Sequence, residues 1–402
     1  MTIFIILISY TIAALFVLIQ TRYYVWGMTS SKTIRAVVLI ALILLMLLPV
    51  LGTFLPVCAA KFFFMKWGNV LIGILGGYAV VLVIAWIFRT MLRLVLRNKI
   101  DTKDISRSAC TIIICVALAF MLGTSIYGQI KSVDVKAEYY TAEIHKGSEE
   151  ADAAGDAVRK ESMRIVLAAD LHLSVNSRPS TMAKMVKLIN QQNPDVVIIG
   201  GDIFTSTYDG LKDPEKYIKE LKQIKSKYGV YAVYGNHDVE EDLFCGFAIS
   251  PASEAVRDPR MTQFMKDCGF KILEDDVAVL PNGVTVAGRA DESKPLDKAL
   301  NRKTPAELLK DCDHTKPIIV AEHEPGEYKA LAKAGADIVL SGHTHNGQVF
   351  PGNIAAYMSD VNNYGYQNVD GMHTYVCAGA GFFGPPMRLG TESDIFVIDM
   401  EY

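Results

Sequence analysis

The chain has 402 residues, enough for more than one domain, and 51% of them are hydrophobic, with a mean hydropathy of +0.24. The hydrophobic excess lies before residue 128, which indicates membrane segments rather than one large soluble core. Because the formal net charge is −3 and no long basic tract is present, we expect no nucleic-acid partner.

Four apolar stretches are long enough to cross a bilayer and contain no charged side chain: residues 3–20, 36–56, 67–88 and 109–127. They predict an all-α transmembrane segment of four helices within residues 1–128, with the lipid bilayer as its partner. An alternative is that the spans form a transport unit and the later domain is accessory. Since ion and proton pathways use charged residues inside the membrane, we prefer an anchor.

Lys and Arg residues in the short loops predict the orientation of the spans. The loop after the second span holds only Lys61 and Lys66, whereas the loops after the first and third spans are more basic. Their basic residues are Arg22, Lys32, Arg35, Arg89, Arg93, Arg97, Lys99, Lys103 and Arg107. Basic loops stay in the cytoplasm. The sequence therefore predicts a multi-pass protein of the cell membrane whose catalytic domain, after residue 128, is extracytoplasmic.

The remaining chain has an α/β pattern. Residues 129–162 predict an edge strand near 132–144 and then a charged, Ala- and Gly-rich linker. Over 163–402, strands alternate with helices, which predicts an α/β domain with parallel strands at its core. Helices are expected at 181–192, 214–227, 256–267, 305–311 and 326–334, and a strand at 271–280 is expected to pair with 284–288.

Polar side chains with metal-binding chemistry follow several short apolar runs of this domain. The groups are Asp170-Leu171-His172, Gly201-Asp202, Gly235-Asn236-His237-Asp238, His323 and Gly342-His343-Thr344-His345. Ligands of open α/β sheets bind beyond the carboxyl ends of the strands, where these groups fall. Asp170 and His172 are two residues apart, so in extended backbone both side chains would leave on the same side. Mixed nitrogen and oxygen donors suit Mn, Fe or Zn better than Ca.

In this order, the groups resemble the calcineurin-like metallophosphoesterase superfamily over roughly residues 160–400. The segments 342–348 and 381–388 are similar to its YkuE/YaeI-like bacterial branch, in which polytopic relatives also place spans before the domain. The resemblance implies a four-layer α/β/β/α sandwich with mixed sheets and a metal-dependent phosphoric ester hydrolase.

The resemblance also implies two divalent metal ions, Mn, Fe or Zn, and assigns residues to them. Asp170, His172, Asp202 and His345 would hold the first ion, and Asp202, Asn236, His323 and His343 the second. His237 would be catalytic, contacting the scissile phosphate, and Asp238 would orient its ring. Metal-activated hydroxide would then hydrolyse a phosphate ester or pyrophosphate, while His237 steadies the transition state or protonates the leaving oxygen. The substrate would be a phosphorylated small molecule or a lipid-linked compound of the cell envelope.

The chain departs from this pattern in two places. Asn346 stands where many relatives have Gly, and Asn tolerates left-handed backbone angles, so we expect the turn to survive. The acidic residue that is common a few positions after the Gly-Asp pair is missing, and no Arg follows Asp202, which argues against a phosphoprotein substrate. The alternative function is a non-catalytic metal-binding receptor or assembly domain, which would not need His237.

Other residues leave alternatives open. Arg289 and Asp291 are interpreted as surface residues rather than cleft residues. Phe382-Phe383 would either form an apolar wall for a lipid chain or pack a turn. Cys245 and Cys268 are a disulfide candidate if the domain faces an oxidising space, although spacing alone does not show the bond.

Overall fold

The computed structural model describes residues 2–95, 106–146, 161–244, 247–249, 255–294, 302–358 and 362–402. These residues divide into two compact units. The first comprises Met1–Ile130, Asp242–Ser250 and Gly384–Met387, and the second comprises Lys131–Glu241, Pro251–Phe383 and Arg388–Tyr402. Cys268 is a buried free thiol, and its candidate partner Cys245 lies outside the described residues.

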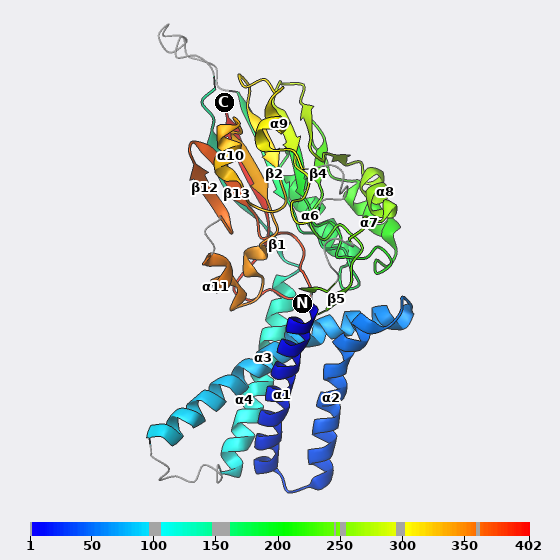
Figure 1. Ribbon diagram of the computed structural model, residues 1–402, viewed down its shortest axis with the longest axis vertical. Coiled ribbons are helices and arrows are strands. Elements are labelled where there is room, and N and C mark those ends of the chain that lie inside the picture. The colour runs from blue at the N-terminus through cyan, green and yellow to red at the C-terminus, as the bar shows by residue number, and fades with distance from the viewer. Residues whose placement is uncertain are drawn as a thin grey trace. The chain divides into compact units, whose positions relative to one another are not determined.

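Long helices make up most of the first unit (Figure 1): α1 (Thr2–Met28), α2 (Lys32–Phe54), α3 (Ala59–Val95) and α4 (Arg107–Lys131). Within the described residues, these are the four helices that are long and apolar enough to cross a membrane, which confirms the predicted helical anchor. The helices extend beyond the predicted spans. Arg89, expected in a loop, therefore lies within α3, where its Nη2 donates to Gln20 Oε1 at 3.1 Å.

Two later segments of the chain belong to this helical unit. One contains the hairpin of β5 (Leu243–Phe244) and β6 (Phe247–Ala248). Thr53 Oγ1 of α2 donates to the carbonyl oxygen of Leu243 at 3.0 Å, and Lys61 of α3 pairs with Asp242 at 3.2 Å. The other segment, Gly384–Met387, follows directly after Phe383.

The second unit contains two mixed six-stranded sheets. In the first sheet the order is β1 (Val135–Glu143), β14 (Ser393–Glu401), β2 (Ser162–Ala168), β3 (Val196–Gly200), β4 (Val230–Val233) and β7 (Lys271–Ile272). In the second the order is β12 (Gly365–Val369), β13 (Met372–Val376), β11 (Ile338–Ser341), β10 (Ile318–Ala321), β9 (Thr285–Gly288) and β8 (Asp276–Val279). The strands β2, β3 and β4 run parallel, as do β9, β10 and β11.

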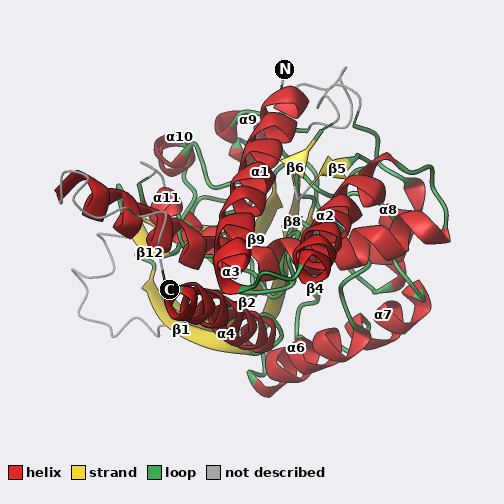
Figure 2. Cartoon of the chain, turned by 90° about the horizontal axis from the view of Figure 1, so that it is seen from below, coloured by secondary structure: helices red, strands yellow, loops and turns green. Residues whose placement is uncertain are grey.

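Helices cover the outer face of each sheet, which confirms the predicted four-layer α/β/β/α sandwich (Figures 1 and 2). The first sheet packs on α6 (Pro179–Gln191), α7 (Pro214–Leu221) and α8 (Pro259–Asp267). The second packs on α9 (Pro305–Leu309) and α10 (Tyr328–Lys333). A third apolar core joins the two sheets, with Leu167 and Ile198 on one side and Ile319 and Leu340 on the other.

One predicted strand is wrong. The segment 271–280 does not form a single strand, because β7 pairs with β4 in the first sheet whereas β8 pairs with β9 in the second. The chain turns between them at Asp275, whose φ of 50° lies in the left-handed region.

Candidate metal centre

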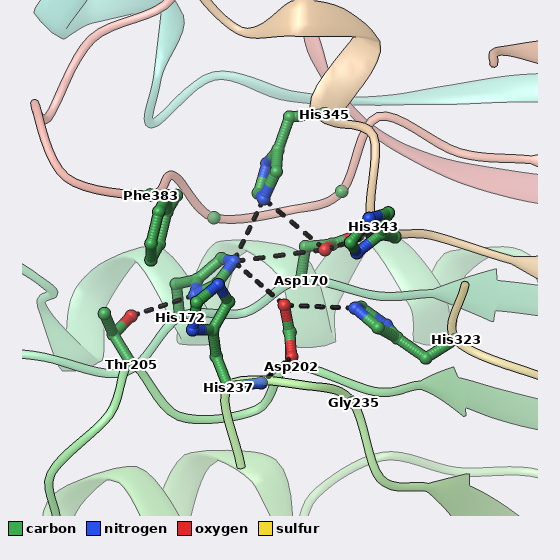
Figure 3. Close-up of polar contacts among 12 residues, drawn as sticks. Asp170, His172, Asp202, Thr205, Gly235, His237, His323, His343, His345 and Phe383 are labelled. Atoms are coloured by element: carbon green, nitrogen blue, oxygen red, sulfur yellow. Dashed lines mark hydrogen bonds and ion pairs between the residues drawn. The ribbon is translucent and has the colours of Figure 1, made fainter. Parts of the chain in front are cut away.

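The residues predicted to bind metal lie together in the second unit (Figure 3). They follow the carboxyl ends of parallel strands: Asp170 and His172 follow β2, Asp202 follows β3, Asn236 follows β4, His323 follows β10, and His343 and His345 follow β11. Because parallel strands end at one edge of a sheet, the fold itself assembles side chains that are far apart in the sequence.

The first cluster is centred on two imidazole rings that face each other. His172 Nε2 and His345 Nε2 are 3.0 Å apart, and Asp170 Oδ1 lies 3.4 Å from His345 Nε2. All three residues are buried. Two ring nitrogens and a carboxylate oxygen aimed at one small volume are a donor set that fits a divalent transition metal.

The second cluster lies next to the first. His323 Nε2 is 3.1 Å from Asp202 Oδ2 and 3.1 Å from Asn236 Oδ1, and His343 Nδ1 is also 3.1 Å from that amide oxygen. Asp202 Oδ2 is also 3.6 Å from His172 Nε2 and so faces both clusters. Asp170 likewise has an oxygen within 4.8 Å of the donor atoms of Asp202 and His323.

The backbone of these residues is left-handed rather than extended, and this conformation orients their side chains toward the site. Asp170 has φ 53° and His172 has φ 44°, and Asp202, His343 and His345 also have positive φ. The expectation that Asp170 and His172 leave an extended strand on the same side is therefore wrong, since β2 ends at Ala168. Non-glycine residues in this region cost of order 1–3 kcal/mol each, and such strain clusters at functional sites.

Glycines next to the ligands leave room for this close approach. A Cβ added to Gly235 would overlap the Asp202 carboxylate, and one added to Gly342 would overlap Asp170 Oδ2. Asn346 has φ 49°, so Asn does adopt the left-handed turn conformation that was expected at this position.

Hydrogen bonds fix which ring nitrogen faces the site. The Nδ1 of His323 lies 2.9 Å from the carbonyl oxygen of Gly200, so this nitrogen carries a proton and Nε2 is the ring nitrogen that faces the second cluster. The Nδ1 of His172 is hydrogen-bonded to Thr205 Oγ1 at 2.9 Å, which likewise leaves Nε2 toward the first cluster. Thr205 stands within the stretch that lacks the expected acidic residue.

Burial sets the protonation of the metal-free site. It lowers the pKa of His172 to about 3 and that of His345 well below its ordinary value, so both rings are neutral and able to bind a metal. Burial also raises the pKa of Asp170 to about 8. Asp202 is equally buried, but the neighbouring imidazoles, His323 first, hold its pKa well below the ordinary range.

His237 lies at the margin of the first cluster, with its ring centroid 5.8 Å from that of His172. Its backbone N–H donates to Asp202 Oδ1 at 2.8 Å, and the Phe383 ring stacks on it with centroids 4.4 Å apart. Figure 3 shows this ring beside the imidazoles. Phe383 therefore packs on the candidate site itself, a role that the sequence left open between a lipid wall and turn packing.

The expected orientation of His237 by Asp238 is wrong. The Asp238 carboxylate is fully buried and accepts the backbone N–H groups of Phe204 and Gly235, both at 2.8 Å. The carboxylate that reaches the His237 ring is Glu241, whose Oε1 lies 2.7 Å from Nδ1. An acid four residues after His237 was a signal in the sequence that the prediction missed.

Arg289 and Asp291 are not surface residues, as was expected, because both are buried. Arg289 donates to Glu322 Oε2 at 2.7 Å and to Glu327 Oε2 at 2.8 Å. Glu322 precedes His323, so this buried ion pair helps to hold the strand end that carries a candidate ligand.

Comparison with known proteins agrees with this mixed α/β, metal-binding architecture. Residues 163–347 match the calcineurin-like phosphoesterase family. Over these residues the chain is similar to that family, and the relatives that it matches carry metallophosphoesterase names.

Three relatives illustrate the similarity. The chain is 29% identical over 243 residues to a metallophosphoesterase of Campylobacter jejuni, covering 60% of each protein. It is 31% identical over 239 residues to a transmembrane protein with metallophosphoesterase domain of Bos taurus, covering 58% of this chain and 52% of that one. It is 23% identical over 222 residues to the UDP-2,3-diacylglucosamine pyrophosphatase LpxG of Chlamydia trachomatis, covering 46% and 64%. The matches thus span between about half and two thirds of these relatives' lengths.

Proposed function

We propose that this chain is a membrane-anchored phosphoesterase that uses two divalent metal ions, Mn, Fe or Zn, to hydrolyse a phosphate ester or pyrophosphate. One observation carries the proposal. Asp202 Oδ2 lies between two sets of donors, 3.6 Å from His172 Nε2 and 3.1 Å from His323 Nε2. A carboxylate that faces both clusters suits a pair of neighbouring cations.

Different residues of the chain would bind the metal ions and contact the substrate. Asp170, His172 and His345 would hold one ion, and Asn236, His323 and His343 the other, with Asp202 shared. When bound, such a pair lowers the pKa of water and neutralises charge on phosphoryl oxygens. His237 contributes no atom to either cluster, and we assign its ring to the phosphate and to proton donation toward the leaving oxygen.

A lipid-linked substrate is the form of the proposal that the surroundings of the site favour. The helical anchor keeps the domain at a bilayer. The segment that follows His345 exposes Phe350, Ile354, Tyr357 and Met358 by 58%, 51%, 87% and 79%. Residues 346–358 contain no charged side chain, as suits contact with acyl chains. LpxG, which is named as a pyrophosphatase of a diacylated nucleotide sugar, adds support from a relative.

The proposed location is outside the cytoplasm, from the distribution of basic residues among the loops. Fusions after Tyr402 test it, because alkaline phosphatase matures only outside the cytoplasm and green fluorescent protein exported in unfolded form stays dark. Alkaline phosphatase activity without fluorescence is expected. The opposite pair of signals would place the domain in the cytoplasm.

The activity test uses the full chain in detergent, stripped with chelator and reloaded separately with Mn, Zn, Fe or Mg. Hydrolysis of p-nitrophenyl phosphate or bis-p-nitrophenyl phosphate should return with a transition metal. It should be lost in Asp202→Ala, and His237→Ala should reduce it by about 10²–10⁴-fold while still binding metal. A protein that binds metal but hydrolyses neither these esters nor a diacylated pyrophosphate would favour the receptor or assembly alternative.

A further inference from the structure

Glu241 is a buried carboxylate that no metal cluster uses. Its side chain is 1% exposed, and Oε1 lies 2.7 Å from His237 Nδ1. A carboxylate oxygen can only accept a hydrogen bond when ionised, so Nδ1 must be the donor. The contact therefore fixes Nδ1 toward Glu241 and leaves Nε2 as the ring nitrogen that is free to meet a substrate.

A lysine holds the other oxygen of this carboxylate. Lys294 Nζ lies 2.5 Å from Glu241 Oε2, and the lysine side chain is 8% exposed. The backbone N–H of Lys294 donates to Asp291 Oδ1 at 2.9 Å, which fixes the start of the lysine side chain as well. Burial opposes ionisation of Glu241, but His237 and Lys294 together lower its pKa below the ordinary value.

The two other groups near His237 that could compete for this role are already committed elsewhere. Asp238 accepts two backbone N–H groups, and Thr205 is bonded to His172. Phe383 restrains the face of the His237 ring but cannot choose between its nitrogens. Among the described residues, the Glu241 contact is thus the polar contact that sets the rotation of this ring.

We infer that Glu241 is the positioning residue of His237 and that Lys294 holds Glu241 in place. This inference rests on the proposed function, because it gives His237 its task at the phosphate. It assigns to Glu241 the role that the sequence analysis gave to Asp238.

The test compares Glu241→Gln with Glu240→Gln in the metal-loaded full chain. Glu240 is the adjacent glutamate, and its carboxylate accepts the backbone N–H of Tyr208 rather than contacting His237. With phenyl phosphate, whose leaving group needs a proton, Glu241→Gln should lower kcat by about 10²-fold with KM and metal content unchanged. With 2,4-dinitrophenyl phosphate, whose leaving group needs none, the loss should be much smaller. Glu240→Gln should match the unaltered chain on both substrates.

Two further variants separate positioning from folding. Lys294→Met should also lower kcat more on phenyl phosphate than on 2,4-dinitrophenyl phosphate. Lys294→Arg should keep the kcat of the unaltered chain, because the ion pair is kept. The double variant His237→Ala/Glu241→Gln should be no slower than His237→Ala alone. In metal-free protein labelled with ¹⁵N-histidine, a low-field Nδ1 proton signal should be present and should vanish in both Glu241→Gln and His237→Ala.

The outcomes distinguish this inference from the function itself. If His237→Ala is slow while Glu241→Gln behaves as Glu240→Gln, the phosphoesterase stands and the positioning role is refuted. An equal loss on both aryl phosphates, or additive losses in the double variant, would also refute it. If the unaltered chain hydrolyses no phosphate ester with any metal, the proposed function fails and the inference fails with it.

Discussion

Replacing Arg388 should destabilise the second unit more than any surface change, because this cation is fully buried. Its Nη1 donates to the carbonyl oxygen of His345 at 3.1 Å, and Nη2 donates to those of Ala378, Gly379 and Gly381 at 2.6, 3.0 and 2.8 Å. Met has a similar length and no donor, so Arg388→Met leaves these carbonyl groups without their partner. A buried acceptor left without its partner costs about 1–3 kcal/mol, so the loss of these contacts together should cost about 3–5 kcal/mol of unfolding free energy.

The measurement is thermal unfolding of the metal-free full chain in detergent, so that loss of metal does not contribute. A loss of this size should lower Tm by on the order of 10 °C for a unit of about 200 residues. The control is Arg260→Met, which removes ion pairs from Arg260 to Asp209 and Asp258 at a half-exposed side chain. Such pairs contribute about 0–1 kcal/mol. If Arg388→Met and Arg260→Met unfold at the same temperature, the backbone carbonyl groups do not depend on Arg388 and the reasoning is refuted.

Three further predictions concern metal binding, measured by titration calorimetry. Gly342→Ala should weaken affinity by about 10–100-fold, because the added Cβ displaces the Asp170 carboxylate; unchanged affinity would contradict the close packing. Thr205→Val should weaken it by about tenfold, since the ring of His172 loses its hydrogen bond at 2.9 Å; wild-type affinity would show that the ring is held otherwise. Metal must displace a proton from Asp170, whose pKa burial raises to about 8, so affinity should rise as pH approaches that value. Calorimetry in buffers of different ionisation enthalpy should detect proton release, and its absence would contradict a protonated Asp170.

The position of the candidate ligands was predictable from the sequence because it depends on topology. Short apolar runs with interleaved helices predict parallel strands, and parallel strands bring their carboxyl ends to one edge. Asp170, Asp202 and Asn236 follow three such neighbouring strands, β2, β3 and β4, and the structure places them together. That relation needs no knowledge of side-chain contacts.

Local backbone conformation was not predictable in the same way. The spacing of Asp170 and His172 fits an extended strand, yet both residues have positive φ. What permits this geometry is the small size of Gly235 and Gly342, which are distant in sequence and reach the ligands only in the folded chain. Spacing rules treat one segment at a time and therefore miss such constraints.

The contacts that restrain the His237 ring were also not predicted from the sequence. Glu241 sets the rotation of the ring and Phe383 stacks on its face. The residues that directly follow each of them, Asp242–Ser250 and Gly384–Met387, belong to the helical unit. The predicted domain of residues 163–402 includes both of these segments. Phe383 lies far from His237 in the sequence, so its place on the His237 ring could be found only in the folded chain.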